Sequence, residues 1–478
     1  MLRMTTIVAL MLLLGSHGSL AQESEAEEPK AGVLEAEGLE AEIPEADESS
    51  QGDRYFIEQQ NYRRLVSNGD FLEASNSAKR LVVYSIERFG RDSMETAAAL
   101  SDLGQAQREA GDIPAARENF ASAIEIIEDK KDRLSQELIS PLTGLGRANL
   151  QGNRPDSAAD AYERALHVSQ VNEGPQNLEQ VGLLSELTDA YYQLGDFKQA
   201  DALQRYTVGL YQRRYPAKDD DRLVPILYER ARWLNRMGQI VKEQAVYLQI
   251  IRIVEKADGR SSLNLIPALT ALGKSYVYSI EPEAQAIGER RLRRAISIAK
   301  KNDEASNTLK ADTLIALADY NLLTGDRTAG RRGYIRAWDV FDEESLEDLD
   351  ARDERFASPV PLSRQDRGPE DFKASVAEFE ETYGGSDRAI GYVTVGYDVT
   401  VSGSTRNLVV IEAVPAGYKD AEALAWVRRF KFRPRIVDRT IVETPDQFYR
   451  YEFPYVPSED DEVLLQQTGG VEAVTDES

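Results

Sequence analysis

"LSDLGQAQREAGDIPAARENFASAI", residues 100–124, joins two amphipathic segments through the dipeptide Gly111-Asp112. Apolar and small residues recur every three or four positions on both sides of this dipeptide, which is the spacing of one helix face. Glycine can adopt the positive φ that ends a first helix, and an aspartate side chain can cap a second one. We therefore expect two helices joined by a tight turn.

The same turn recurs at intervals of 41 to 44 residues through most of the chain. A fixed period of this length is the signature of a repeat architecture. The members are Gly69-Asp70, Gly111-Asp112, Gly152-Asn153, Gly195-Asp196, Gly238-Gln239 and Gly325-Asp326, with a degenerate one near Glu281-Pro282. The protein is therefore predicted to be mainly α, with an α-solenoid of about seven helix-turn-helix repeats over residues 54–345.

These repeats resemble the tetratricopeptide repeat. In the stretch 100–124, the small and aromatic positions of that repeat are matched by Gly104, Ala116, Phe120 and Ala123. In "LSELTDAYYQLGDFKQADAL" (184–203), they are matched by Leu187, Tyr191, Gly195 and Ala200. A period longer than 34 residues is similar to the variant found in kinesin light chains. The resemblance implies a superhelical scaffold whose concave face binds peptides or proteins that the repeats do not name.

The first 21 residues have the pattern of a secretory signal peptide. Arg3 precedes the apolar run 7–14, and Ser19-Leu20-Ala21 forms a small-x-Ala cleavage site. A short buried N-terminal helix is the alternative. The chain contains 0 cysteines, so no disulfide stabilises the exported protein. Together these features favour a bacterial periplasm, with no transmembrane segment left after residues 1–21 are removed.

Acidic residues dominate the composition. The chain has 82 Asp and Glu against 57 Lys and Arg, a formal net charge of −25, which disfavours nucleic acid and anionic lipid as partners. Residues 22–53 are rich in Glu and Ala and lack aromatics. We expect this segment, and the acidic tail 457–478, to be disordered. A role for residues 22–53 as an acidic ligand of a basic partner is the alternative.

The repeat period stops after residue 345. Residues 346–384 are charged and contain prolines, which predicts an acidic helix end followed by a linker. From residue 385 the pattern changes, and apolar residues begin to alternate with polar or small ones. Val393, Val395, Tyr397, Val399 and Val401 are expected on one side of a strand. Such alternation predicts a half-buried strand, followed by a Ser-Gly-Ser turn and a second strand over 408–414.

A short helix and a last strand complete this C-terminal region. We expect the helix to open near Asp420 and regular structure to stop at Pro434. The segment "TPDQFYRYEFPY" (444–455) predicts an aromatic strand. The order β-β-α-β predicts a small α+β domain over 385–456, with one helix packed on an antiparallel sheet.

This C-terminal pattern resembles the C-terminal domain of the TonB energy-transducer family. The matching residues are Gly391, Val393, Val395, Tyr397 and Val399, the stretch "ALAWVRRFKFRP" (423–434) with Asp420 before it, and Tyr451 and Phe453. The sequence departs from the family in lacking a Tyr-Pro element before the first strand and a long Pro-Lys or Pro-Glu spacer.

The resemblance implies that the last strand adds an extended peptide from an outer-membrane receptor to the sheet edge, and that force from a proton-driven inner-membrane motor is transmitted. The implied peptide-binding residues are Gln447, Phe448, Tyr449, Arg450, Tyr451, Glu452 and Phe453.

The basic side chains of "WVRRFKFRPR" (426–435) have two interpretations. Leu424, Val427 and Phe430 are expected to face the sheet, whereas Arg428, Arg429 and Lys431 are expected to point to water at a helix C-terminus. The alternative is that these three cations contact an acidic partner.

The sequence offers no catalytic constellation. His167 is the only histidine after the signal, and cysteine is absent, so triads and His-rich or Cys-rich metal sites are nearly excluded. Asp219-Asp220-Asp221 lacks the spacing of a calcium loop, and Gly384-Gly385 is not followed by the Lys-Ser/Thr of a phosphate loop. No catalytic, cofactor or metal residue is predicted.

We therefore expect a non-enzymatic periplasmic adaptor associated with TonB-type energy transduction or outer-membrane transport. An envelope scaffold or assembly factor with no transport role is the main alternative. An enzyme that uses carboxylates and tyrosines of the solenoid groove is a third interpretation.

Overall fold

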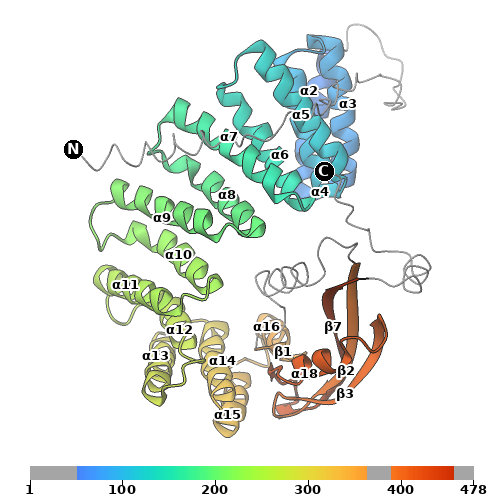
Figure 1. Ribbon diagram of the computed structural model, residues 1–478. Helices are drawn as coiled ribbons and strands as arrows, with labels where there is room; N and C mark the ends of the chain where they lie inside the picture. The colour runs from blue at the N-terminus through green and yellow to red at the C-terminus, as the bar shows by residue number, and fades with distance from the viewer. Residues whose placement is uncertain (1–50, 363–388, 457–478) are drawn as a thin grey trace.

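The computed structural model describes residues 51–362 and 389–456 (Figure 1). The predicted signal peptide 1–21, most of the acidic segment 22–53, and the tail 457–478 lie outside the described residues. Helix α2 already begins at Gln51, so residues 51–53 belong to the first helix and not to the predicted acidic segment.

Consecutive helices pair into hairpins, as the turn motif predicts. The pairs are α2 (Gln51–Asn68) with α3 (Phe71–Phe89), α4 (Met94–Ala110) with α5 (Ile113–Lys130), α6 (Ile139–Gln151) with α7 (Pro155–Glu173), α8 (Val181–Leu194) with α9 (Phe197–Arg214), α10 (Val224–Arg236) with α11 (Ile240–Asp258), α12 (Ile266–Lys274) with α13 (Pro282–Lys301), and α14 (Asn307–Leu323) with α15 (Arg327–Trp338). Single 3₁₀ turns, η3 (Gln136–Leu138), η4 (Leu178–Gln180), η5 (Asp221–Leu223) and η6 (Leu263–Leu265), precede α6, α8, α10 and α12.

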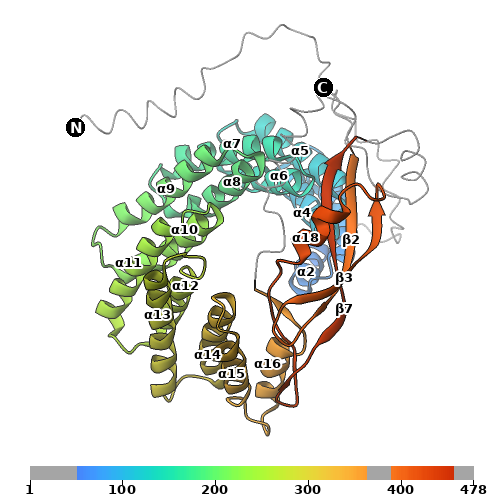
Figure 2. The same cartoon turned by 60° about the horizontal axis from the view of Figure 1, so that its bottom comes forward.

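The hairpins stack into a curved α-solenoid. First helices of successive hairpins touch one another, as in the pairs α4 with α6, α6 with α8, and α12 with α14. The two views show the helices following an arc, with the C-terminal sheet on its open side (Figure 1, Figure 2).

The small and aromatic positions of the repeat meet between neighbouring hairpins. Phe120 of α5 is 2% exposed, and its ring lies against Gly104 of α4 and Gly144 of α6. A Cβ atom at Gly144 would lie 2.3 Å from that ring, so this position has room only for glycine. Burial of such a ring contributes about 2–3 kcal/mol.

Five of the seven turns have the predicted positive φ at glycine, and three of them also have the predicted aspartate cap. Gly111 has φ 91°, and Asp112 accepts a hydrogen bond from the Ala115 N–H at 3.4 Å. Asp196 and Asp326 cap α9 and α15 in the same way. The prediction is wrong at Gly152, where Asn153 takes the positive φ of 56°, because asparagine also tolerates this conformation. Asp70 makes no side-chain capping bond.

The described part of the predicted linker is structured. Helix α16 (Leu346–Phe356) follows α15, and strand β1 (Val360–Pro361) pairs with a strand of the C-terminal domain. Phe356 is fully buried against Trp338, with ring centroids 5.8 Å apart. The helix looks like a linker in sequence because most of its side chains are charged. Among the described residues α16 has no partner helix in a hairpin, so the helical part of the chain contains one helix more than the predicted hairpins account for.

The C-terminal domain has the predicted β-β-α-β order, with three short strands added. Its elements are β2 (Ala389–Val399), β3 (Thr405–Val414), α18 (Asp420–Val427), β4 (Phe432–Arg433), β5 (Ile436–Val437), β6 (Thr440–Ile441) and β7 (Thr444–Tyr455). The main sheet is antiparallel with the order β3-β2-β7, β4 pairs with β1, and β5 pairs with β6.

The alternation of β2 builds the core of this domain. Val393, Val395 and Val399 are fully buried, and Ala423 and Val427 of α18 are fully buried in the same cluster. Val401 does not continue the pattern: β2 ends at Val399, and Val401 lies exposed in the turn.

Among residues 51–362 and 389–456, none of the helices combines the length and the hydropathy that a membrane span requires.

Substitution of two glycines by alanine tests whether the turn at Gly111 depends on the backbone conformation of glycine and not on its small size. A Cβ atom at Gly111 or at Gly182 of α8 would meet no atom within 4 Å, but only Gly111 has a positive φ. Gly111→Ala should lower the free energy of unfolding by about 1 kcal/mol. Gly182→Ala should raise it by about 0.5–1 kcal/mol. Urea unfolding of both variants checks this, and shifts of the same sign would contradict the assignment of the turn.

Candidate functional site

Strand β7 lies at the edge of the sheet, and it contains the predicted peptide-binding residues. It pairs with β2 along one side, and no strand within residues 51–362 and 389–456 pairs with the other side. Pro454 lies opposite Ile390 in the regular part of the ladder. Proline has no N–H and is confined to strand positions that face away from a partner strand. Because N–H directions alternate along a strand, the N–H groups of Phe448, Arg450 and Glu452 point outward too.

Side chains along β7 divide into two sets. Tyr451 and Phe453 are 1% exposed and belong to the core, and Tyr449 packs edge-on against Phe430 with ring centroids 5.0 Å apart. Phe448 is 74% exposed, Arg450 and Glu452 are also exposed, and Gln447 is half-buried. Only the second set is available to a ligand.

The outer face of the sheet carries an apolar patch beside this edge. Phe448 of β7 and Val409 of β3 both lie opposite Gly396 of β2. Val409 and Ile411 are exposed large hydrophobic residues, and a Cβ atom at Gly396 would lie 2.9 Å from Ile411. We call Phe448, Val409 and Ile411 the sheet patch.

The basic residues before β4 do not all behave as predicted. Arg428 and Arg429 are exposed. Lys431 is half-buried, its Nζ donates to Ser404 Oγ at 3.1 Å, and burial lowers its pKa. Leu424 is only half-buried, because Ala423 and Val427, four residues apart on α18, take the face that packs on the sheet.

Sequence reasoning missed the residue that joins the two parts of the chain, Arg433. Its Nε and Nη2 donate to the two carboxylate oxygens of Asp319 on α14, at 3.1 and 2.9 Å. Asp319 is 5% exposed and also accepts from the Tyr334 hydroxyl at 2.9 Å. Burial raises the pKa of Tyr334 well above its ordinary value. Burial alone would lower the pKa of Arg433, but the adjacent Asp319 carboxylate raises it.

Apolar contacts surround this ion pair. Ile436 of β5 and Ile441 of β6 are 3% and 8% exposed, and they share one hydrophobic cluster with Trp338 and Phe356 of the solenoid. Arg439, in the turn between β5 and β6, pairs with Asp339 at 2.7 Å. The C-terminal domain is thus docked on α14, α15 and α16.

The only sequence signal for this joint is an aspartate in an apolar helix run. Asp319 stands between Ala318 and Tyr320 in "ALADYNLL" (316–323), and a buried carboxylate requires a partner. That partner is 114 residues away, so spacing could not identify it.

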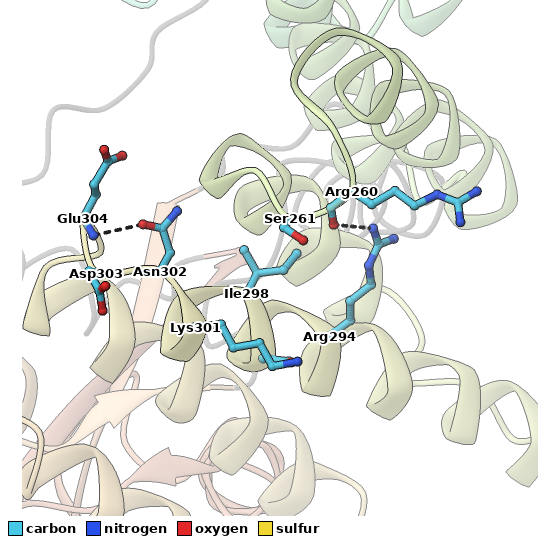
Figure 3. A pocket seen from close by; sticks show the side chains of 9 residues that line it. Arg260, Ser261, Arg294, Ile298, Lys301, Asn302, Asp303 and Glu304 are labelled. Carbon is cyan, nitrogen blue, oxygen red and sulfur yellow. Dashed lines mark hydrogen bonds between the residues drawn. The ribbon is translucent and has the colours of Figure 1, made fainter.

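An open cleft of about 600 Å³ lies between the loop after α11 and the C-terminal part of α13 (Figure 3). Arg294 crosses it, donating to the carbonyl of Arg260 at 3.1 Å and pairing with Glu255 at 2.6 Å. Its lining contains no histidine or cysteine, and Arg294, which crosses it, is already engaged by Glu255 and the Arg260 carbonyl.

The remaining candidate residues also have local structural roles. His167 is exposed on α7. Asp219 contacts Lys256, and Asp220 accepts from the Arg222 N–H at 3.1 Å at the start of η5. Gly384-Gly385 lies outside the described residues. In the part of the chain that the structure describes, no group of three or more His, Asp or Glu side chains could hold a metal ion.

Comparison with known proteins gives distant structural neighbours. No protein-family model matches the chain, so the TonB resemblance stays a prediction. No curated protein matches its sequence.

Three solved structures that are similar to this chain have low sequence identity to it. A protein of Podosopora anserina described as a kinesin light chain with nearly identical TPR-like repeats is 18% identical, covering 43% of this chain and 97% of its own, with a TM-score of 0.39. BtubC of P. vanneervenii is 16% identical over 58% of this chain and 90% of its own, with a TM-score of 0.27. The TPR2AB domain of yeast Sti1 in complex with pHSP90 is 16% identical over 63% and 97%, with a TM-score of 0.24.

The Arg433–Asp319 pair can be tested by a double-mutant cycle. Arg433→Met and Asp319→Leu should each lower the free energy of unfolding by about 3–5 kcal/mol, because each leaves one buried charge uncompensated. The double variant should lose less than the sum, with a coupling energy of about 2–3 kcal/mol. Urea unfolding followed by tryptophan fluorescence measures these values, and additive losses would contradict the pairing.

Proposed function

We propose that this protein is a non-enzymatic adaptor of the bacterial cell envelope, associated with TonB-type transport at the outer membrane. In this proposal the solenoid holds one protein partner, and the C-terminal domain adds an extended peptide of a second partner to β7. The observation that carries it is the edge of β7, with outward N–H groups beside the sheet patch. Main-chain hydrogen bonds at such an edge supply affinity, and adjacent apolar pockets supply specificity.

The length of β7 supports this role. Natural sheets usually shield an edge with short strands, bulges or covering segments. β7 runs for 12 residues, its stretch from Gln447 to Tyr455 pairs in regular register with β2, and Phe448, which is exposed, lies beside the edge. Arg450 stacks over the Tyr392 ring of β2 at 3.5 Å, so its side chain lies over the sheet and not across the outer side of β7.

The inner face of the solenoid supplies the first binding surface. A hollow of about 550 Å³ is lined by α4, α6 and α8, the first helices of three successive hairpins, and by Tyr162 of α7. Glu186 accepts from the Tyr162 hydroxyl at 2.9 Å and pairs with Arg147 at 2.7 Å. A surface of fixed charges and hydroxyl groups suits a polar peptide.

A second candidate function is an envelope scaffold or assembly factor with no transport role. The docking of Ile436 and Ile441 against the last helices favours it, because repeat arrays need a cap on their terminal apolar face. The two functions differ in whether β7 binds a receptor peptide.

The periplasmic location in this proposal rests on the signal-peptide pattern of residues 1–21. Fractionation of cells that express the tagged full-length chain would measure the location directly.

Two replacements of Arg450 distinguish the contribution of the β7 backbone to peptide binding from that of the Arg450 side chain. Arg450→Pro removes an outward N–H, whereas Arg450→Ala keeps that N–H and removes the side chain. The tagged chain should be cross-linked in envelope fractions of iron-limited cells, and captured peptides identified by mass spectrometry. We expect a periplasmic segment of a TonB-dependent receptor with the native chain and with Arg450→Ala, and its loss with Arg450→Pro.

Absence of any receptor segment would refute the transport function. Equal capture by all three chains would place the contact elsewhere than β7. Thermal unfolding of the two variants, with similar midpoints, is the control for folding.

A further inference from the structure

A second surface is built jointly by the solenoid and the C-terminal domain. A groove of about 1250 Å³ runs between α13 and α15 and is also lined by α14. Arg439, Thr440 and Ile441 of the β5–β6 hairpin close one part of it. We call this the α13–α15 groove, and it is separate from β7 and the sheet patch.

Positive charge is concentrated in this groove. Six basic side chains and three carboxylates line it. All three carboxylates are engaged: Glu289 pairs with Arg293 at 2.6 Å, Asp339 pairs with Arg439 at 2.7 Å, and Asp326 caps α15.

Four cations of the groove remain without a carboxylate partner in the described part of the chain: Lys300, Arg331, Arg332 and Arg336. All four are exposed. In a chain with a formal net charge of −25, such a cluster is a local attractor for anionic groups against a repulsive background.

The groove also has an aliphatic lining beneath the cations. Leu317 is 8% exposed and Ile441 is 8% exposed, while Ile296, Leu314 and Ile335 are half-buried. A ligand that matches both features has carboxylates for the rim and an aliphatic side chain for the interior. Burial of one such side chain contributes about 1.5–3 kcal/mol.

We propose that the α13–α15 groove binds an acidic segment of a protein partner that carries an aliphatic anchor. The carboxylates of the segment contact Arg331, Arg332 and Arg336, and the anchor packs on Leu317 and Ile441. Nucleic acid and anionic membrane surfaces match the cations, but neither supplies an aliphatic side chain to a groove between helices.

Binding at this groove stabilises the docked domain. Because Arg439 and Ile441 come from the C-terminal domain while the other groove residues come from α13, α14 and α15, only the docked arrangement presents the complete groove. A ligand that binds one state of an equilibrium stabilises that state.

Fluorescence anisotropy of a labelled peptide tests the proposal. The probe is a fluorescein-labelled peptide rich in Asp and Glu with two central leucines, and the control probe carries Asn and Gln in place of the acids. The full-length chain should bind the acidic probe at least tenfold more tightly than the neutral one. That preference should weaken as salt rises, because exposed charges are screened.

A matched pair of variants locates the site. Arg331→Glu with Arg332→Glu should weaken binding of the acidic probe at least tenfold. Arg64→Glu on α2 with Arg252→Glu on α11 makes the same charge change at exposed positions outside the groove and should alter the affinity by less than about twofold, as expected for screened distant charges. Matching thermal unfolding of the two double variants establishes that both are folded.

Three results would overturn the proposal. Equal losses in the two double variants would show a non-local charge effect. Tighter binding of a single-stranded oligonucleotide or of anionic phospholipid vesicles than of the acidic peptide would assign the groove to another class of ligand. A chain lacking residues 457–478 that binds the probe at least tenfold tighter would assign the groove to the protein's own acidic tail. None of these results bears on β7.

Discussion

The buried ion pair between Arg433 and Asp319 is the constraint on which the arrangement of the two parts depends. Asp319 is almost fully buried in α14, where an unpaired carboxylate would be strongly unfavourable. Its two oxygens accept from Arg433, and one also accepts from Tyr334. Such a pair adds little net stability relative to apolar packing, but it specifies one geometry. The solenoid therefore ends in a site that only the C-terminal domain completes.

Docking in this geometry determines which surfaces the protein presents. The β5–β6 hairpin is held against α15 by Ile436, Ile441 and the Arg439–Asp339 pair, so it contributes one part of the α13–α15 groove. β7 forms one edge of the sheet, with its unpaired side facing away from β2. A partner held by the solenoid and a peptide added to β7 would thus be kept at a fixed separation. Holding two partners at a fixed separation is what an adaptor does.

Local pattern predicts the elements well and their assembly poorly. The Gly-Asp turns and the alternation from Val393 to Val401 each depend on neighbours in sequence, and the structure confirms both, apart from Gly152, Asp70 and Val401. Helix α16 resembles a linker in sequence because its one deeply buried residue, Phe356, lies at its end. Lys431 and Arg433 resemble exposed cations in sequence because their partners, Ser404 and Asp319, are 27 and 114 residues away.

The fixed docking of the C-terminal domain is tested most directly by a distance between the two parts in solution. Because the chain has 0 cysteines, Lys198→Cys on α9 and Ala416→Cys after β3, both exposed, would place two spin labels without background. Double electron–electron resonance should give one narrow distance distribution, and Arg433→Met should broaden it. A broad distribution in the native background, unchanged by Arg433→Met, would contradict the docked arrangement.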